Sequence, residues 1–224
     1  MNAETAERYM PRIMTDRAEP FEIKGIGYTV FPAPARSRSF RRDVYFDPQR
    51  VAFAVEYAVY FDFDIQHLYD LEHIWIYVGH DGAVVDAEAS FHGFYLKAMA
   101  LEGYEIVDQT HLKIFCQPGK HAFMQEGSLF QILPDWQLCC NLLAGSEGLL
   151  VMDLFEGRIA TNDETQTVVE AYIKANYSFN PTLEFEYKPL DTKLLLPWES
   201  LFEAIPPRIN AILATIKQKE GDHK

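Results

Sequence analysis

The sequence is poor in cysteine and in positive charge, and each shortage excludes a class of protein. Only three of its 224 residues are cysteines, namely Cys116, Cys139 and Cys140. An odd count that includes an adjacent pair is no disulfide framework, so we expect reduced thiols and a cytoplasmic location. The formal net charge of −13 leaves few clustered cations for phosphate contacts, which argues against a nucleic-acid partner.

Long apolar runs and the common nucleotide and nucleophile motifs are also missing. No stretch approaches the roughly 20 apolar residues that a transmembrane helix needs, so no transmembrane segment is expected. Residues 1–8 are too polar and acidic for a secretory signal. The sequence holds no nucleophile elbow, phosphate-binding loop or dinucleotide fingerprint, and so it names no substrate. It shows no internal repeat and no interdomain linker, and we expect a single domain over residues 1–224.

Aromatic and apolar residues are abundant. The chain contains 16 Phe and 12 Tyr, and 48% of its residues are hydrophobic. This content is enough for one domain with a substantial core, and the aromatic residues favour β-structure. We therefore expect a mainly β fold, an antiparallel β-sandwich with peripheral α-helices and a C-terminal amphipathic helix.

Local patterns place the elements of this fold. The Asp-Gly pair at 81–82 predicts a hairpin turn. Strands are predicted at 25–31, 51–63, 71–78, 83–92, 111–116 and 185–187. A short helix is expected at 94–101, a capping box at 161–164, and an amphipathic helix at 206–219 with proline in its first turn.

A group of ionisable residues lies between two strongly apolar runs, each of which is predicted to form a strand. Asp70 and Glu72 project from the same face of a strand, because side chains two residues apart do so. Asp64 and His67 precede them in the connecting loop. Two adjacent carboxylates repel unless one takes a proton or a cation bridges them. Carboxylate and imidazole ligands favour Mg²⁺, Ca²⁺ or Mn²⁺, with Zn²⁺ also possible. The alternative is a solvated strand face with ordinary surface groups.

These residues form a motif that resembles a known family. His67-x-x-Asp70-x-Glu72-His73 resembles the H-x-x-D-W-E-H core of the necrosis- and ethylene-inducing-like proteins. It also resembles the D-W-E-H core of the related vacuolar-sorting-associated family. Leu71 stands where the motif has tryptophan, and the glycine that usually precedes the first histidine is absent.

The resemblance extends to neighbouring segments, roughly over residues 10–125. The aromatic stretch 57–64 resembles the family strand whose terminal aspartate supplies a further ligand, and the Glu-Pro-Phe at 19–21 resembles the opening of the vacuolar-sorting-associated family. The resemblance implies that the metal ligands are Asp64, His67, Asp70 and Glu72.

Two further histidines match segments of the family pattern. His92-Gly93 resembles a strand-ending "S, x, H, G", and Gly119-Lys120-His121-Ala122 resembles "G, small or basic, H-A". The resemblance makes His121 and His92 candidate catalytic groups that move protons, orient a ligand or contact a substrate. The alternatives are a turn or edge residue for His92 and a capping or core histidine for His121.

A basic cluster lies in the proline-containing segment 31–47. Guanidinium groups could clamp a phosphate or another anion. The alternative is a solvated loop. The candidate anion-binding residues are Arg36, Arg38, Arg41 and Arg42, together with Lys120.

Three functions follow from these patterns. The first is a divalent-metal-dependent hydrolase of a phosphorylated or glycosylated small molecule. The second is a metal-dependent module that binds a carbohydrate or lipid head group without catalysis. The resemblance to the necrosis- and ethylene-inducing-like proteins, which are toxins, implies this function. In the third, the ion only braces the loop between two strands.

Overall fold

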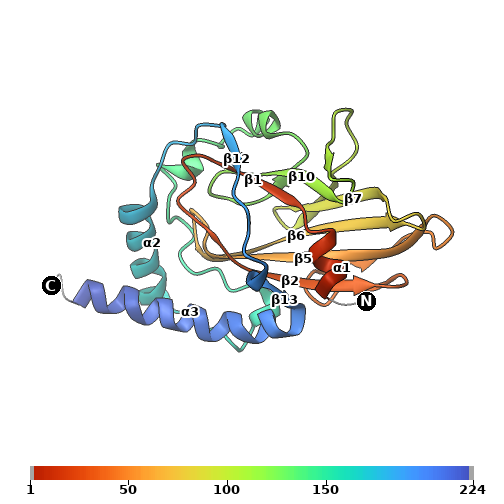
Figure 1. The fold of residues 1–224 in the computed structure, drawn as a ribbon. Coiled ribbons are helices and arrows are strands. Elements are labelled where there is room, and N and C mark those ends of the chain that lie inside the picture. Colours follow the sequence, from red (N-terminus) through yellow and green to blue (C-terminus); the bar gives the residue numbers. More distant parts are fainter. Residues whose placement is uncertain (1–2, 222–224) are drawn as a thin grey trace.

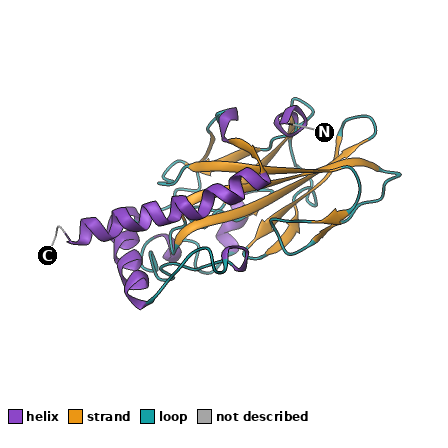
Figure 2. Ribbon diagram, turned by 90° about the horizontal axis from the view of Figure 1, so that it is seen from below, coloured by secondary structure: helices purple, strands orange, loops and turns teal. Residues whose placement is uncertain are grey.

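The computed structural model describes residues 3–221 and consists mainly of two packed β-sheets with helices along their margins (Figures 1 and 2). The larger sheet has the strand order β13-β2-β5-β6-β7-β8. Its strands are β2 (Ile23–Phe31), β5 (Val51–Phe63), β6 (Leu68–Gly79), β7 (Val84–Phe91), β8 (Phe94–Lys97) and β13 (Leu195–Pro197). A separate two-stranded hairpin is formed by β3 (Ala35–Arg36) and β4 (Asp43–Val44).

The smaller sheet has the order β11-β10-β1-β12, with β9 paired to β10. Its strands are β1 (Arg12–Asp16), β9 (Ile106–Val107), β10 (His111–Cys116), β11 (Phe123–Met124) and β12 (Phe185–Tyr187). The helices are α1 (Ala3–Arg8), α2 (Asp163–Tyr177), α3 (Trp198–Gly221) and the short 3₁₀ helices η1 (Gly127–Ile132), η2 (Leu138–Cys140), η3 (Asp153–Phe155) and η4 (Thr192–Leu194).

The prediction of a mainly β fold with a C-terminal helix is confirmed, but the sheets are mixed rather than purely antiparallel. Strand β1 runs parallel to β10, and β13 runs parallel to β2. Each of these pairs joins strands far apart in the sequence, where no tight turn forces an antiparallel arrangement. Ile13 of β1, Ile114 of β10 and Ile74 of β6 belong to one buried cluster, which places the main core between the two sheets.

Strand β6 is buried along its whole length because both of its faces are covered. Ile74 and Ile76 join the main core, whereas Trp75 and Tyr77 join a second cluster on the opposite face. The period-two pattern therefore separated the two faces correctly. The predicted hairpin to β7 is also confirmed, with Gly82 at a φ of +81° in the turn.

The segment at 31–47 covers this second face and is not a solvated loop throughout. Val44 and Phe46 pack in the second cluster with Trp75. Arg42 is also buried, and its Nη2 lies 2.6 Å from Glu88 Oε2. A charge can be buried here because its partner is buried beside it.

Three local predictions need correction. Residues 94–97 form the edge strand β8 rather than a helix, since they pair with β7. Helix α3 begins at Trp198, eight residues before the expected start, so Pro206 lies inside it. Asn162, not the preceding threonine, caps α2, and its side chain accepts a hydrogen bond from the backbone N–H of Thr165.

Helix α3 lies against β2 (Figure 2), and glycine allows this close approach. A Cβ atom on Gly27 would lie 2.8 Å from a ring carbon of Trp198, and one on Gly25 would lie 2.7 Å from Leu201. Glycine within a strand is thus explained by the helix that packs on it. Among the described residues, no helix is long and apolar enough to cross a bilayer.

Candidate metal centre

The candidate site is built on the loop that joins β5 to β6. The backbone N–H of Asp64 donates to His67 O at 2.9 Å, which closes the loop on itself. Ile65 N–H donates to Gly119 O at 2.8 Å, and Leu68 N–H donates to Gly148 O at 2.8 Å. These bonds hold the segments around 119 and 148 against the loop, so residues distant in sequence reach the same place.

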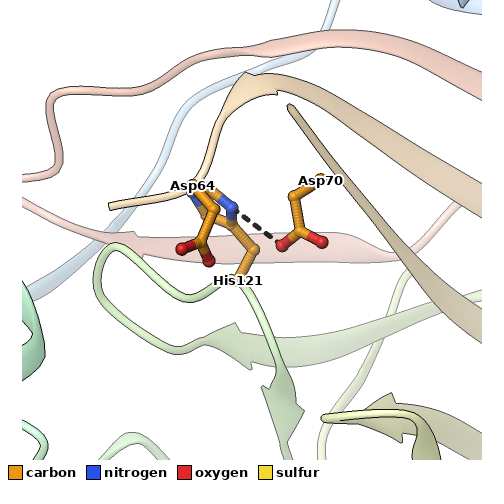
Figure 3. A group of neighbouring side chains, drawn as sticks. All are labelled: Asp64, Asp70 and His121. Carbon is orange, nitrogen blue, oxygen red and sulfur yellow. Dashed lines mark hydrogen bonds and ion pairs between the residues drawn. The ribbon is translucent and has the colours of Figure 1, made fainter. Parts of the chain in front are cut away.

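Asp64, Asp70 and His121 converge at the base of this loop (Figure 3). One potential ligand atom from each lies within 4.8 Å of the others. All three residues are buried, with exposed fractions of 0%, 5% and 0%. His121 Nδ1 lies 3.2 Å from Asp70 Oδ2, and its ring stacks on Phe61 with centroids 3.7 Å apart. The imidazole is therefore fixed in position beside the two carboxylates.

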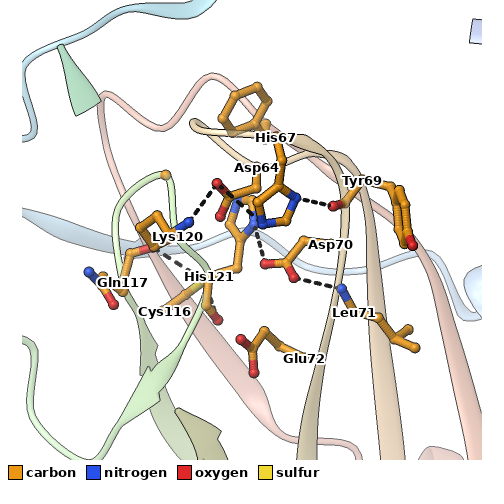
Figure 4. Close-up of polar contacts among 12 residues, drawn as sticks. Asp64, His67, Tyr69, Asp70, Leu71, Glu72, Cys116, Gln117, Lys120 and His121 are labelled. Carbon is orange, nitrogen blue, oxygen red and sulfur yellow. Dashed lines mark hydrogen bonds and ion pairs between the residues drawn. The ribbon is translucent and has the colours of Figure 1, made fainter. Parts of the chain in front are cut away.

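Other charged groups surround these three residues (Figure 4). Lys120 Nζ lies 2.9 Å from Asp64 Oδ1, and His67 Nε2 lies 3.8 Å from the same oxygen. His67 Nδ1–H donates to Tyr69 O at 2.8 Å, which leaves Nε2 facing the acids as a lone-pair donor. Glu72 accepts a hydrogen bond from the Ser90 hydroxyl.

The pKa values of the buried groups reflect this crowding. Burial, together with the charge of Asp70, raises the pKa of Glu72 to about 8. Burial opposes charge on Asp64 as well, but its interactions with His67 and Lys120 outweigh this effect and lower the pKa of that carboxyl. Although burial acts to lower it, contacts with Asp70 and Glu19 raise the pKa of His121 to about 10. Protons and Lys120 thus balance the acidic charge.

A cavity of about 600 Å³ opens onto these groups. It is large enough for a small organic ligand. Apolar side chains on one side come from the segment after 149 and include Leu150, Met152 and Leu154. The ionisable side chains in its wall are Arg41, Asp64, His67, Asp70, Glu72, His73, His92, Lys120, Glu147 and Asp153.

The four predicted metal ligands all reach this cavity, but not in equivalent ways. Asp64 and Asp70 lie in the group with His121, which we had placed among the catalytic candidates. His67 and Glu72 border the same space, one near Asp64 and the other held by Ser90. The ligand set remains a prediction, and the geometry adds His121 to its candidates.

The predicted catalytic histidines lie in different surroundings. His92 is exposed at the cavity wall, at a φ of +49°, and its Nε2–H donates to Gln117 Oε1 at 2.9 Å. His121 is fully buried beneath the acids and is not among the residues that line the cavity. It is therefore better placed to hold an ion than to exchange protons with a ligand.

The predicted anion-binding residues are dispersed. Only Arg41 and Lys120 line the cavity. Each arginine already has an acidic partner: Arg36 pairs with Asp43, Arg38 with Glu199, Arg41 with Asp153, and Arg42 with Glu88.

Two residues near the site had no assigned role in the sequence analysis. Glu19 lies behind His121, with Oε1 3.7 Å from Nε2 and Oε2 accepting from Gly119 N–H at 2.7 Å. In the sequence, the Glu-Pro-Phe motif at 19–21 was the pattern that could have indicated a role for Glu19. Glu147 Oε2 lies 4.0 Å from His67 Nε2. It comes from the segment at 129–151, which carried no readable pattern.

The donor set and one orphaned atom fit a divalent cation. Asp64 Oδ2 is buried and makes no hydrogen bond within the described residues, whereas His121 Nε2 faces Glu19 Oε1 at 3.7 Å. Buried polar atoms normally have a partner. Ligands on opposite sides of an ion are about 4.7 Å apart for bonds of roughly 2.3–2.4 Å, which is compatible with the observed spacing. Oxygen and imidazole ligands suit Mn²⁺, Mg²⁺, Ca²⁺ or Zn²⁺.

No protein-family model and no curated protein sequence matches the chain. Solved structures resemble it over about half of its length. NLPPya in complex with glucosamine is 18% identical, with 55% of this chain and 66% of that chain covered at a TM-score of 0.35. NLPPya in complex with mannosamine is 20% identical, with coverage of 55% and 67% and a TM-score of 0.34.

A structure described as "Toxin fold for microbial attack and plant defense" is 18% identical, with coverage of 55% and 67% and a TM-score of 0.34. The chain thus spans about two thirds of the length of these proteins. The expected resemblance to the necrosis- and ethylene-inducing-like proteins is confirmed as a distant likeness of fold.

Proposed function

We propose that this protein binds a divalent cation through Asp64, Asp70 and His121, with His67 and Glu72 as neighbouring ligands. The observation that carries the proposal is the convergence of two buried carboxylates and an imidazole within 4.8 Å, where Asp64 Oδ2 has no hydrogen-bond partner among the described residues. Burying such groups without a partner is unfavourable, and a cation removes that cost.

We further propose that the cavity holds a polar small molecule and that the site supports its hydrolysis. A bound divalent ion would activate water or polarise an ester or phosphoryl oxygen. His92 stands in the cavity wall with Nε2–H held by Gln117, so its Nδ1 can accept a proton. Arg41 can turn from Asp153 to an anionic group, because an exposed ion pair contributes only about 0–1 kcal/mol.

A second candidate function is binding without catalysis. It is supported by the position of His121, which is buried behind the acids and does not border the cavity. Of the two histidines predicted to move protons, His92 alone can then contact a ligand. A cation that only fixes the orientation of a sugar or phosphate group needs no proton transfer at all.

The metal proposal is tested by titrating metal-free protein with Mn²⁺, Mg²⁺, Ca²⁺ and Zn²⁺ in a calorimeter. We expect one ion per chain and a rise in melting temperature with ion concentration. Asp64→Asn should weaken binding at least about tenfold, since it removes a buried charged ligand. Asp62→Asn is the matched control, because Asp62 lies only two residues earlier, near the end of β5, but pairs with Arg208. Absence of binding by the wild type to all four ions would refute the proposal.

Hydrolysis is tested separately with a panel of phosphate and carboxylic esters. Turnover that disappears with a chelator and returns with the ion supports the hydrolase. Glucosamine, mannosamine and their phosphates serve as probes of binding alone. A ligand-dependent melting shift without turnover on any substrate supports the second candidate instead.

A further inference from the structure

Two adjacent cysteines lie beside the candidate site and take no part in it. Cys139 and Cys140 belong to η2, and their Sγ atoms are 3.7 Å apart. Both are buried, although Cys139 keeps 6% of its surface exposed. The third cysteine, Cys116, lies in β10, where its Sγ is 3.6 Å from the backbone oxygen of His121. The chain therefore offers one close pair of thiols and one isolated thiol.

We propose that Cys139 and Cys140 form a peroxide-reactive dithiol that closes reversibly into a disulfide between neighbouring residues. Closure brings the sulfur atoms from 3.7 Å to a bond of about 2.05 Å, a movement of under 2 Å shared by two side chains. Adjacent Cα atoms are about 3.8 Å apart, below the usual range of about 4.4–6.8 Å for disulfides. The bond is therefore strained and readily reduced, as in labile rather than structural disulfides.

Cys139 is the residue that meets the oxidant. It has the more exposed side chain, and the hydrogen bond from Cys140 lowers its pKa, which favours the thiolate. The thiolate attacks one oxygen of hydrogen peroxide, and the O–O bond breaks. The products are a sulfenic acid on Cys139 and a hydroxide ion, which takes a proton from solvent and leaves as water.

Cys140 then resolves the sulfenic acid. Its sulfur loses a proton and attacks the sulfur of Cys139, the S–O bond breaks, and the departing hydroxide takes up that proton as a second water molecule. In total, two thiols and one hydrogen peroxide give one disulfide and two waters. The sulfurs lose two electrons and the peroxide gains them.

The disulfide would act on the segment that supplies Lys120 and His121. In the reduced protein, Cys140 Sγ lies 3.3 Å from Pro118 O. The same sulfur packs so closely on Gly119 that a Cβ there would lie 3.2 Å from it. Oxidation removes the thiol proton and moves the sulfur, so backbone signals at 118–121 should respond to the redox state.

The test is peptide mapping of the reduced full-length protein before and after a molar excess of hydrogen peroxide. We expect the peptide that contains both cysteines to lose the mass of two hydrogens and to regain it with dithiothreitol. In the peroxide-treated protein, before dithiothreitol is added, Cys116 should be the one thiol of the three that is alkylated in denaturant. Survival of all three thiols, or oxidation of the pair only to sulfinic or sulfonic acids, would overturn the proposal.

Variants assign the roles of the two sulfurs. In Cys140→Ser the sulfenic acid on Cys139 persists, and dimedone should trap it. In Cys139→Ser we expect a yield of trapped sulfenic acid at least tenfold lower than in Cys140→Ser. Cys116→Ser is the matched control and should still form the disulfide. Equal trapping at both positions would contradict the assigned order. The mapping of the wild type requires no bound metal and no variant, so it stands apart from the metal proposal.

Discussion

His73 gives the sharpest stability prediction, because it is a buried histidine that stays neutral. Its ring is 1% exposed, and Nε2 lies 3.0 Å from the Ser39 hydroxyl oxygen. The Nδ1 atom has no hydrogen-bond partner within the described part of the chain. Burial lowers the pKa of His73 to about 3, with the charge of Arg42 acting in the same direction.

The sign of the pH effect follows from this depressed pKa. In the unfolded chain, His73 takes up a proton below about pH 6.5, whereas in the folded protein it does so only near pH 3. The unfolded state therefore gains stability as the pH falls between these values. Each pH unit well below 6.5 removes about 1.4 kcal/mol, so the loss between about pH 8 and about pH 5 is about 2 kcal/mol.

The perturbation is His73→Gln, which retains a donor toward Ser39 but does not titrate. Urea unfolding of both proteins at about pH 8 and pH 5 gives four free energies of unfolding. We expect the wild type to lose about 2 kcal/mol more than the variant over this interval. Because both proteins share every other titrating group, the difference isolates His73. Equal losses in the two proteins would show that the imidazole is protonated in the folded state and would refute the reasoning.

Two pairs of substitutions test other contacts. Glu88→Gln leaves the charge of Arg42 buried without a carboxylate and should lower the free energy of unfolding by about 3 kcal/mol, whereas Glu199→Gln in an exposed pair should change it by about 1 kcal/mol or less. If urea unfolding showed that Glu88→Gln and Glu199→Gln lower the free energy of unfolding equally, burial of the ion pair would not determine its contribution. Gly119→Ala, at a φ of +70° with a side chain 2.9 Å from the new Cβ, should cost at least about 2 kcal/mol. Gly157→Ala, at +73° with no atom within 4 Å, should cost less, and a cost as large as that of Gly119→Ala would refute the close contact.

The strands and faces around the acidic loop could be predicted because their signals are local. Alternation placed Ile74 and Ile76 on one side of β6 and Trp75 and Tyr77 on the other, and Gly82 marked the turn. In a strand, side-chain direction depends only on the parity of the residue number. The same rule places Asp70 and Glu72 on one face.

Contacts between distant segments could not be predicted in this way. His121 joins Asp64 and Asp70 because β10 pairs in parallel with β1, and the loop after β10 is then held by Ile65 and Glu19. The sequence pattern could make His121 a candidate, but it could not choose between proton transfer and metal ligation.

The arginine-rich segment shows the same difference between what is local in sequence and what folding decides. From the sequence, four arginines were equivalent members of one basic cluster. Folding separates them: Arg42 is buried against Glu88, 46 residues away, while Arg41 reaches the cavity and meets Asp153. Composition and periodicity report what each residue tends to do among its neighbours in sequence. Which charge is buried, and which acid neutralises it, depends on how the sheets and loops pack. That packing exists only once the whole chain has folded.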